Sequence, residues 1–413
     1  MSEAKPRLPS RRGTGPNVAS AGAKPSTIIG PSPPEQAGFA RRPKSLPDHS
    51  TPLIFGPAYL DRVVRVDRPL VDRSLGGRPL DGSVDGRAIE PGEGLHLVDP
   101  IGNRLEIDVA GSPWPGPSGR IGLSRPLSAP GGEPWTRLVK SVGWRDDLGG
   151  MGAGFAAALG GELVSALGPE ADPVSRTIQR LLAKAGVLHH PIRVDHPADW
   201  TLLVTSGEHA DKLPVGFRGC HAALPGLGEW RDRWSPLRVV AALPNRLAAE
   251  ALRGPAAVRA FAPAMRNMLD RNPPVSGFAD LIDVLCCNRG EWEALLDREQ
   301  VAGQVSILVV TDGPAGATLR FTSPNGEAAH LMIPAFPRSR PPADTNRAGE
   351  AFASTLLSTL LGHSWTPGVT DPSLARLAAE RAAAASALVL NRLDFGFPPP
   401  SEVDAALCAG FVG

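Results

Sequence analysis

The sequence has little net charge, few cysteines and no long apolar run. Its 43 Lys and Arg nearly balance its 42 Asp and Glu, for a formal net charge of +1, which argues against a whole-protein role in binding nucleic acid or an anionic membrane. Four cysteines in 413 residues make no disulfide framework, and no zinc-type Cys/His spacing occurs. No apolar run approaches the length of a membrane span, and the N-terminus lacks a signal-peptide core. We therefore expect a soluble protein in the reducing cytoplasm.

Residues 1–50 are rich in Pro, Ser, Gly and Arg, with eight Lys or Arg against three Asp or Glu. Such a segment cannot bury enough apolar surface to offset the entropy lost on ordering, so we expect a disordered tail. Weak binding to acidic partners is the alternative interpretation of its composition. Residues 51–413 are long enough for one large α/β domain.

From about residue 140 onward, strand and helix patterns alternate. Several strand candidates are continuously apolar, as at 305–310, which is typical of strands buried on both faces of a parallel sheet that helices cover. We therefore predict an α/β fold with a mostly parallel central sheet flanked by helices. The main strands are expected at 53–56, 63–66, 162–167, 202–205, 237–243, 282–287, 307–311, 317–321 and 330–333. The helices are expected at 174–185, 255–269, 290–296, 348–361 and 373–390.

Residues 68–135 are crowded with Gly and Pro and contain short apolar alternations at 95–98 and 105–109. This pattern predicts short antiparallel strands joined by turns. We expect a small β-rich lid or flap here rather than a part of the main sheet.

Candidate functional residues follow several of the expected strands, where ligands bind in an open parallel α/β sheet. Asn288 and Glu291 follow the strand at 282–287, and an amide with a carboxylate could orient a metal-bound water near phosphates. The same pair also fits a capping box, with Asn288 as N-cap and Glu291 at the third helical position. Taken alone, this motif favours the cap.

Two further loops leave alternatives open. Thr311, Gly313 and Gly316 follow the strand at 307–311, where glycines let a backbone lie close to a nucleotide and Thr311 can donate to a phosphate oxygen. An ordinary turn between two strands is the competing interpretation. Asp61, just after the first strand, is either a substrate ligand or a loop carboxylate on the surface.

The helix expected at 348–361 begins with the small residues Ala348 and Gly349. Small residues leave the first N–H groups of a helix free, and an uncapped helix N-terminus attracts phosphate. Phosphoryl transfer needs such donors because negative charge develops on the transferred group. Glu350, in the first turn, is either an acid that satisfies the helix dipole or a general base.

These motifs, in this order, resemble those of the ribokinase-like (PfkB) carbohydrate kinases. The resemblance runs from the first strand to the C-terminus. It is carried by segments spread along the chain: Ile54-Phe55-Gly56 through Asp61, Gly149-Gly150 with Leu159-Gly160, Ala185-Gly186-Val187, Asn288 with Glu291, Thr311 with Gly313 and Gly316, Asp344-Thr345 with Ala348-Gly349, and residues 382–385 with 400–403.

The resemblance implies ATP-dependent phosphorylation of a hydroxymethyl group on a sugar or nucleoside, with Mg²⁺, beneath a β-rich lid that suits residues 68–135. Since lids of this family often pair between subunits, it also suggests a homodimer through the lid. No nucleic acid or membrane partner is expected. The implied roles are substrate contacts at Asp61, Gly149, Gly150 and Asp344, nucleotide contacts at Asn288, Glu291, Thr311, Gly313, Gly316 and Thr345, magnesium at Glu291, an anion hole at Arg347, Ala348 and Gly349, and a catalytic base at Glu350.

Three positions depart from the family pattern. Glu350 replaces an Asp and is longer by one methylene, about 1.5 Å of reach, and a misplacement of that scale can cost on the order of a hundredfold in rate. Arg347 replaces the first glycine of the anion hole, although arginine enters positive φ less readily. Its guanidinium could stabilise the phosphoryl group, or its bulk could fill the pocket. Gly154 stands near the place of an expected Asn.

Three functions therefore remain open. The first is a working kinase with Glu350 as its base. The second is a pseudokinase that binds nucleotide or sugar as a sensor or scaffold, because of the changes at 347 and 350. The third, a partner-binding protein that acts through its basic tail, rests on composition alone.

Overall fold

The computed structural model describes residues 51–66, 95–98, 104–107, 141–206, 212–217 and 219–412. The expected disordered tail, residues 1–50, and most of the expected lid, residues 68–135, lie outside this part of the chain. Within the lid segment, β3 (Leu95–Val98) and β4 (Arg104–Ile107) form an antiparallel pair, as their apolar alternation predicts. A lid role for this segment stays a prediction.

Within the described residues, nine strands form one sheet in the order β15-β14-β13-β12-β11-β10-β1-β6-β7. The strands from β7 to β13 are parallel, and β14 and β15 add an antiparallel edge. This confirms the predicted mostly parallel α/β architecture. The strands are β1 (Leu53–Phe55), β6 (Glu162–Leu167), β7 (Leu188–Arg193), β10 (Ser235–Ala241), β11 (Ala256–Ala262), β12 (Val284–Asn288), β13 (Ile307–Thr311), β14 (Ala317–Thr322) and β15 (Ala328–Ile333).

The centre of this sheet is buried on both faces. All three residues of β1 are buried, and so is most of β10 and β13. Burying each leucine-sized side chain stabilises the fold by about 1.5–3 kcal/mol, which explains the continuous apolar runs in the sequence. In β14 the buried Ala317, Leu319 and Phe321 alternate with half-exposed residues, as expected for a strand near the antiparallel edge that packs on one face.

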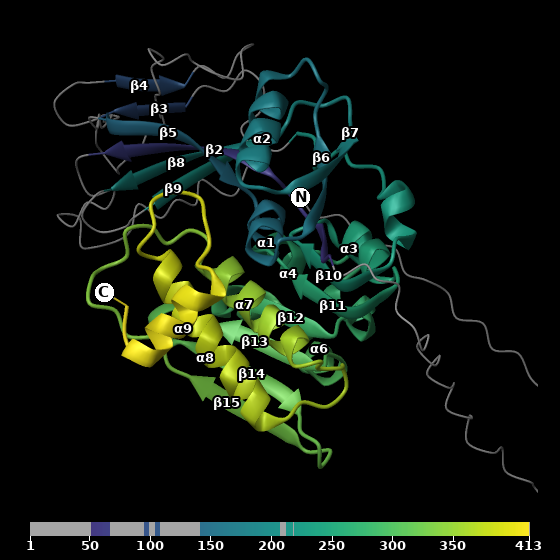
Figure 1. The fold of residues 1–413 in the computed structure, drawn as a ribbon. Helices are drawn as coiled ribbons and strands as arrows, with labels where there is room; N and C mark the ends of the chain where they lie inside the picture. The colour runs from purple at the N-terminus through teal and green to yellow at the C-terminus, as the bar shows by residue number, and fades with distance from the viewer. Residues whose placement is uncertain are drawn as a thin grey trace, which may run out of the picture. The chain divides into compact units, whose positions relative to one another are not determined.

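Helices cover the sheet (Figure 1), and two of them carry the site described below. α1 packs against β1, β6 and β10, while α7 packs against α1, α8 and β12. Among the described residues, no helix has both the length and the apolar content to cross a bilayer. The helices are α1 (Met151–Leu159), α2 (Pro173–Lys184), α3 (Asn245–Leu252), α4 (Met265–Leu269), α5 (Arg289–Ala294), α6 (Arg298–Gln304), α7 (Ala348–Gly362), α8 (Pro372–Val389) and α9 (Pro400–Ala409).

A second sheet, in the order β5-β2-β8-β9, comes from four separate parts of the chain. Its strands are β2 (Tyr59–Val66), β5 (Ser141–Gly149), β8 (Trp200–Ser206) and β9 (Lys212–Phe217). β2 follows β1 after three residues, so the chain passes directly from the main sheet into the second one. Asp61 therefore lies within a strand, opposite Asp147 of β5, and not in a loop.

The helix predicted at 255–269 is wrong. Residues Ala256–Ala262 form strand β11, which pairs with β10 and β12 in the middle of the sheet, and only Met265–Leu269 is helical. The segment is alanine-rich, which favours a helix locally, but the two neighbouring strands supply backbone partners on both sides and bury Val258 and Phe261. Tertiary pairing overrides local propensity here. The sequence interpretation also contains no counterpart of β5, β7, β9 or α3.

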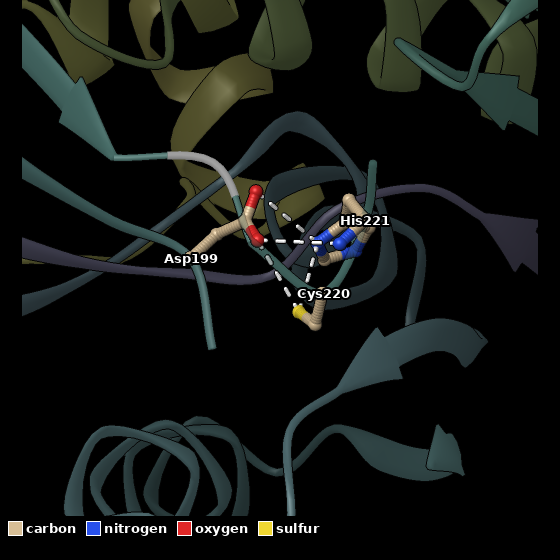
Figure 2. A group of neighbouring side chains, drawn as sticks. All are labelled: Asp199, Cys220 and His221. Carbon is tan, nitrogen blue, oxygen red and sulfur yellow. Dashed lines mark hydrogen bonds and ion pairs between the residues drawn. The ribbon is translucent and has the colours of Figure 1, made fainter. Parts of the chain in front are cut away.

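Asp199 anchors the second sheet through a buried cluster with Cys220 and His221 (Figure 2). Its Oδ1 accepts the backbone N–H groups of Gly219 and His221, at 3.0 and 3.2 Å, and the thiol of Cys220 at 3.3 Å. Nδ1 of His221 lies 3.5 Å from Asp199 Oδ2. Because Asp199 immediately precedes β8, this carboxylate ties the turn at 219–221 to the start of that strand.

Replacing Asp199 by Ala should lower the free energy of unfolding by roughly 2–4 kcal/mol, because two buried N–H groups and a thiol lose their acceptor. Asp199→Asn keeps one acceptor oxygen and should cost less. Urea unfolding followed by circular dichroism measures both. Asp232→Ala, which removes an exposed carboxylate paired with Arg231 at the surface, is the control and should leave stability nearly unchanged. Equal midpoints for Asp199→Ala and the control would contradict the anchoring role.

Candidate functional site

Helix α7 begins in an unusual way. Its N-cap residue, Arg347, has φ 67° and ψ −1°, in the left-handed region, and its own side chain makes no capping hydrogen bond. A non-glycine residue there costs roughly 1–2 kcal/mol, yet Arg347 adopts the backbone conformation that a glycine would supply. The first N–H groups of an α-helix have no carbonyl partner within it. A Cβ at Gly349 would meet nothing within 4 Å, so the first turn faces open space.

Three cavities meet at this first turn. The large cavity, of about 450 Å³, is lined by Thr311, Gly313, Gly316, Thr345, Ala348 and Gly349 among others. The middle cavity, of about 200 Å³, is lined by Asn288, Glu291, Thr311, Gly349 and Glu350 among others. The small cavity, of about 100 Å³, is lined by Asp61, Gly149, Gly150, Arg347 and Glu350 among others.

The structure thus brings together the site residues expected from the sequence. Each of them lines one of the three cavities except Asp344, which contacts Arg347 instead. Glu350 lines both the small and the middle cavity, and Gly349 lines both the middle and the large cavity. The first turn of α7 is therefore the common wall of the three spaces.

Two strand-borne carboxylates face the small cavity. Asp61 of β2 and Asp147 of β5 are register partners, so their side chains lie on the same face of the second sheet. The Asp61 carboxylate occupies the space over Gly149, where a Cβ would lie 2.1 Å from Asp61 Oδ2. Gly150 has φ 93°, and a Cβ there would lie 2.4 Å from the Pro57 carbonyl oxygen. The two glycines are thus required sterically to form this cavity.

Arg347 is held on the small-cavity side of α7. Its guanidinium lies 3.3 Å from Asp147 Oδ2 and 3.5 Å from Asp344 Oδ2, with its carbon 5.6 Å from the centre of the Phe395 ring. Arg145 lies 3.7 and 3.9 Å from the same two carboxylate oxygens. Burial raises the pKa of Asp147, and the nearby charge of Arg347 partly offsets that rise.

Asp147 is a site residue that the sequence interpretation missed. The available signal was its position two residues before Gly149, because alternate residues of a strand share a face. Arg338, which lines the large cavity, was missed as well, and no motif marks it.

Asn288 and Glu291 form the capping box that the sequence favours, and both residues also line the middle cavity. The capping box is present: Glu291 N–H donates to Asn288 Oδ1, and Asn288 N–H donates to Glu291 Oε2, both at 2.9 Å. Burial raises the pKa of Glu291, and the negative charge of Glu350 raises it further. No described Lys or Arg lines this cavity. Carboxylate oxygens are the ligands that a hard divalent ion such as Mg²⁺ takes, so the two carboxylates that line this cavity fit such an ion.

The large cavity has a polar end and an apolar end. The amides of Ala348 and Gly349 stand at one end, while Ala335, Phe336 and Leu390 form an apolar wall. Gly316 has φ 92°, and a Cβ there would lie 2.1 Å from the Ile333 carbonyl oxygen. Only glycine therefore fits at this turn between β13 and β14.

The Asp199, Cys220 and His221 cluster also offers metal-ligating atoms, all within 4.8 Å of one another. Burial and the Asp199 charge raise the pKa of the Cys220 thiol far above its ordinary value, so the thiol stays protonated and donates to Asp199. None of these three residues lines a cavity at α7. Hydrogen bonding accounts for it, as described above.

No protein-family model matches the chain, and no curated protein does either. Solved structures are similar to it over most of their length. Ribokinase from Thermotoga maritima has 17% identity and a TM-score of 0.54, covering 87% of this chain and 99% of its own. Ribokinase from Giardia lamblia has 15% identity and a TM-score of 0.57 with the same coverage. Nucleoside kinase from Burkholderia thailandensis in complex with inosine has 16% identity and a TM-score of 0.54, covering 87% and 98%.

The chain therefore shares the fold of these solved sugar and nucleoside kinases. Within that class, its fold is ribokinase-like, at low sequence identity to the solved structures. This confirms the fold that the sequence resemblance implies.

The Asp147–Arg347 contact yields a prediction about pH. The raised pKa of folded Asp147 means that the folded state holds a proton the unfolded state has lost, so this group's contribution to stability falls as pH rises through the folded pKa. Arg347→Gln removes a charge that lowers the pKa of folded Asp147, so this pKa should rise. The loss of stability should then extend to higher pH. A ¹³C carboxyl NMR titration, assigned with Asp147→Asn, measures it. Arg376→Gln, a surface arginine of α8, is the control; an Asp147 pKa unchanged by Arg347→Gln would contradict the prediction.

Proposed function

We propose that the chain is an ATP-dependent phosphotransferase that phosphorylates a hydroxyl group of a sugar or nucleoside. One observation carries the proposal: Glu350 stands in the first turn of an uncapped helix and lines both the small cavity and the cavity that fits a cation. A carboxylate beside open helix amides is the arrangement that in-line phosphoryl transfer to a hydroxyl requires.

The nucleotide is assigned to the large cavity. Its apolar wall suits a base, and its polar end suits phosphates at the Ala348 and Gly349 amides. Thr311, Gly313, Gly316 and Thr345 line the same space. Mg²⁺ at Glu291 would supply positive charge to the phosphates. In support, solved structures of similar fold include a ribokinase from Arabidopsis thaliana complexed with ribose and ATP, at 15% identity and a TM-score of 0.53.

The acceptor is assigned to the small cavity. Asp61 and Asp147 can accept hydrogen bonds from substrate hydroxyls, and Gly149 and Gly150 let a ligand approach the backbone. Glu350, on the wall toward α7, then takes the proton from the attacking hydroxyl. A substrate bound there meets a γ-phosphate at the α7 amides, because Gly349 and Glu350 are adjacent in the same turn.

A pseudokinase is the second candidate, and Arg347 is the observation that favours it, since the residue replaces a glycine at the anion hole. The geometry of Arg347 supports the working enzyme instead. Its backbone keeps the left-handed conformation, and its guanidinium lies among Asp147, Asp344 and Phe395 and lines the small cavity rather than the large one. Arg347 therefore does not fill the large cavity, which we assign to the nucleotide.

Free thiols at all four cysteines accord with the expected cytoplasmic setting, where ATP is plentiful. A homodimer through the lid remains part of the proposal that rests on the resemblance alone.

Glu350→Gln should reduce kcat by about a hundredfold or more, because it removes the general base and keeps the side-chain length. The assay supplies full-length protein with ATP, Mg²⁺ and a panel of pentoses, hexoses and nucleosides, and follows ADP release. Glu293→Gln, at an exposed position of α5, is the matched control and should retain activity. Nucleotide-induced thermal stabilisation without turnover by the unaltered protein would favour the pseudokinase; equal turnover by both proteins would remove Glu350 as base.

Glu291→Gln should raise the Mg²⁺ concentration needed for half-maximal nucleotide binding by about tenfold, since it removes one of two carboxylates at the middle cavity. Glutamine still completes a capping box, so α5 and the melting temperature should stay unchanged, which separates metal binding from folding. Isothermal titration with an ATP analogue at several Mg²⁺ concentrations measures the effect. An identical Mg²⁺ dependence in the two proteins would place the cation elsewhere.

A further inference from the structure

We propose that Gly154 of α1 is the positioning residue for Glu350. A Cβ built on Gly154 would lie 3.1 Å from Glu350 Cγ and 3.5 Å from Glu350 Cβ, and its third neighbour would be Cζ of Phe397 at 3.6 Å. A carbon–carbon separation of 3.1 Å is well inside the optimal van der Waals distance. The side chain of Glu350 therefore occupies room that exists because residue 154 has no side chain.

Nothing else in the described structure calls for glycine at this position. Gly150 has a positive φ, and a Cβ on Gly152 would lie 2.4 Å from the backbone of Gly56. Gly154 lies within α1 without a positive φ, and the nearest neighbours of its Cβ position are side chains only. Glycine weakens a helix interior relative to alanine. Its presence at 154 is therefore explained by the contact between α1 and α7.

The atom in tightest contact is informative. Cγ of Glu350 is the first side-chain carbon beyond Cβ, so its position decides the direction in which the carboxylate extends. Gly154 and Glu350 line the small cavity together. A methyl group at 154 would displace this methylene by a few tenths of an ångström and turn the carboxylate away from its place on the cavity wall. Small errors in the position of a catalytic group reduce turnover steeply.

The inference rests on the proposed function, because it takes Glu350 as the base. A double-mutant cycle tests it with the unaltered protein, Gly154→Ala, Glu350→Ala and the combination. Gly154→Ala should lower kcat at least tenfold and leave KM for ATP within twofold. In the Glu350→Ala background, which has no Cγ and no base to misplace, the same change should alter the residual kcat by less than threefold. Such non-additivity is the signature of contact between two residues.

Thermal unfolding of the same four proteins gives a readout without turnover. In the Glu350→Ala background, Gly154→Ala should raise Tm, because alanine favours the helix. In the Glu350 background the rise should disappear or reverse. Gly303→Ala is the matched control: Gly303 lies in α6 without a positive φ, and a Cβ there would meet nothing within 4 Å. It should leave kcat unchanged and raise Tm slightly.

The outcomes separate the two ideas. If the unaltered protein turns over and Gly154→Ala matches Gly303→Ala in kcat, the positioning role is overturned and the kinase proposal stands. If no protein of the set turns over, the kinase proposal fails, and the Tm cycle still decides the contact: equal shifts in both backgrounds overturn it. A Gly154→Ala protein that does not fold, rescued by Glu350→Ala, supports it.

Discussion

The N-terminus of α7, left uncapped at Arg347, is the constraint on which the site depends. The first helical N–H groups need acceptors, and the side chain of the N-cap residue supplies none. The three cavities converge there because β12 and β13 end beneath this turn, β5 approaches it from the second sheet, and α1 packs beside it. An anion bound at the turn would satisfy both the amides and the positive end of the helix dipole. The rest of the site can be understood as an arrangement of charge around that anion position.

The charged side chains around the first turn of α7 form two groups, one at the middle cavity and one on the small-cavity side of the helix. Glu291 and Glu350 meet at the middle cavity, where burial and mutual repulsion raise the pKa of Glu291 and no described cation is present. Across α7, Asp147 and Asp344 are matched by Arg145 and Arg347. One side thus pairs its carboxylates with arginines, while the other brings two carboxylates to one cavity. A phosphate placed beside those two carboxylates would meet their repulsion, which a cation bound with it would relieve.

The sequence was sufficient for the parallel α/β architecture and for naming those candidate residues, from contiguous motifs, that the structure brings together at α7. Asn288 with Glu291, Thr311 with its glycines, and Asp344 to Glu350 each lie at the end of a strand or the start of a helix, where local patterns are strong. The position of Asp147 two residues before Gly149 was a weak signal alone, because its place beside Asp61 depends on the register between β2 and β5, which 74 residues separate. Gly154 was noticed only as a departure, since its contact with Glu350 requires the packing of α1 on α7. The helix prediction at 255–269 failed for the same reason: β10 and β12 determine the conformation of β11, and neither is local.

Arg347 links the second sheet to helix α7, and its contacts explain how a residue other than glycine keeps the left-handed conformation at the start of this helix. The left-handed backbone costs roughly 1–2 kcal/mol, and a buried guanidinium needs partners. Asp147 comes from β5, Asp344 from the loop before α7, and Phe395 from the segment after α8. Removing one partner of a buried ion pair typically costs about 3–5 kcal/mol, more than the backbone strain. The ion pairs therefore hold Arg347 in a conformation it would not adopt alone. Since the partners come from separate elements, the start of α7 is fixed to the second sheet, and any movement of β5 would be transmitted to the helix amides through this side chain.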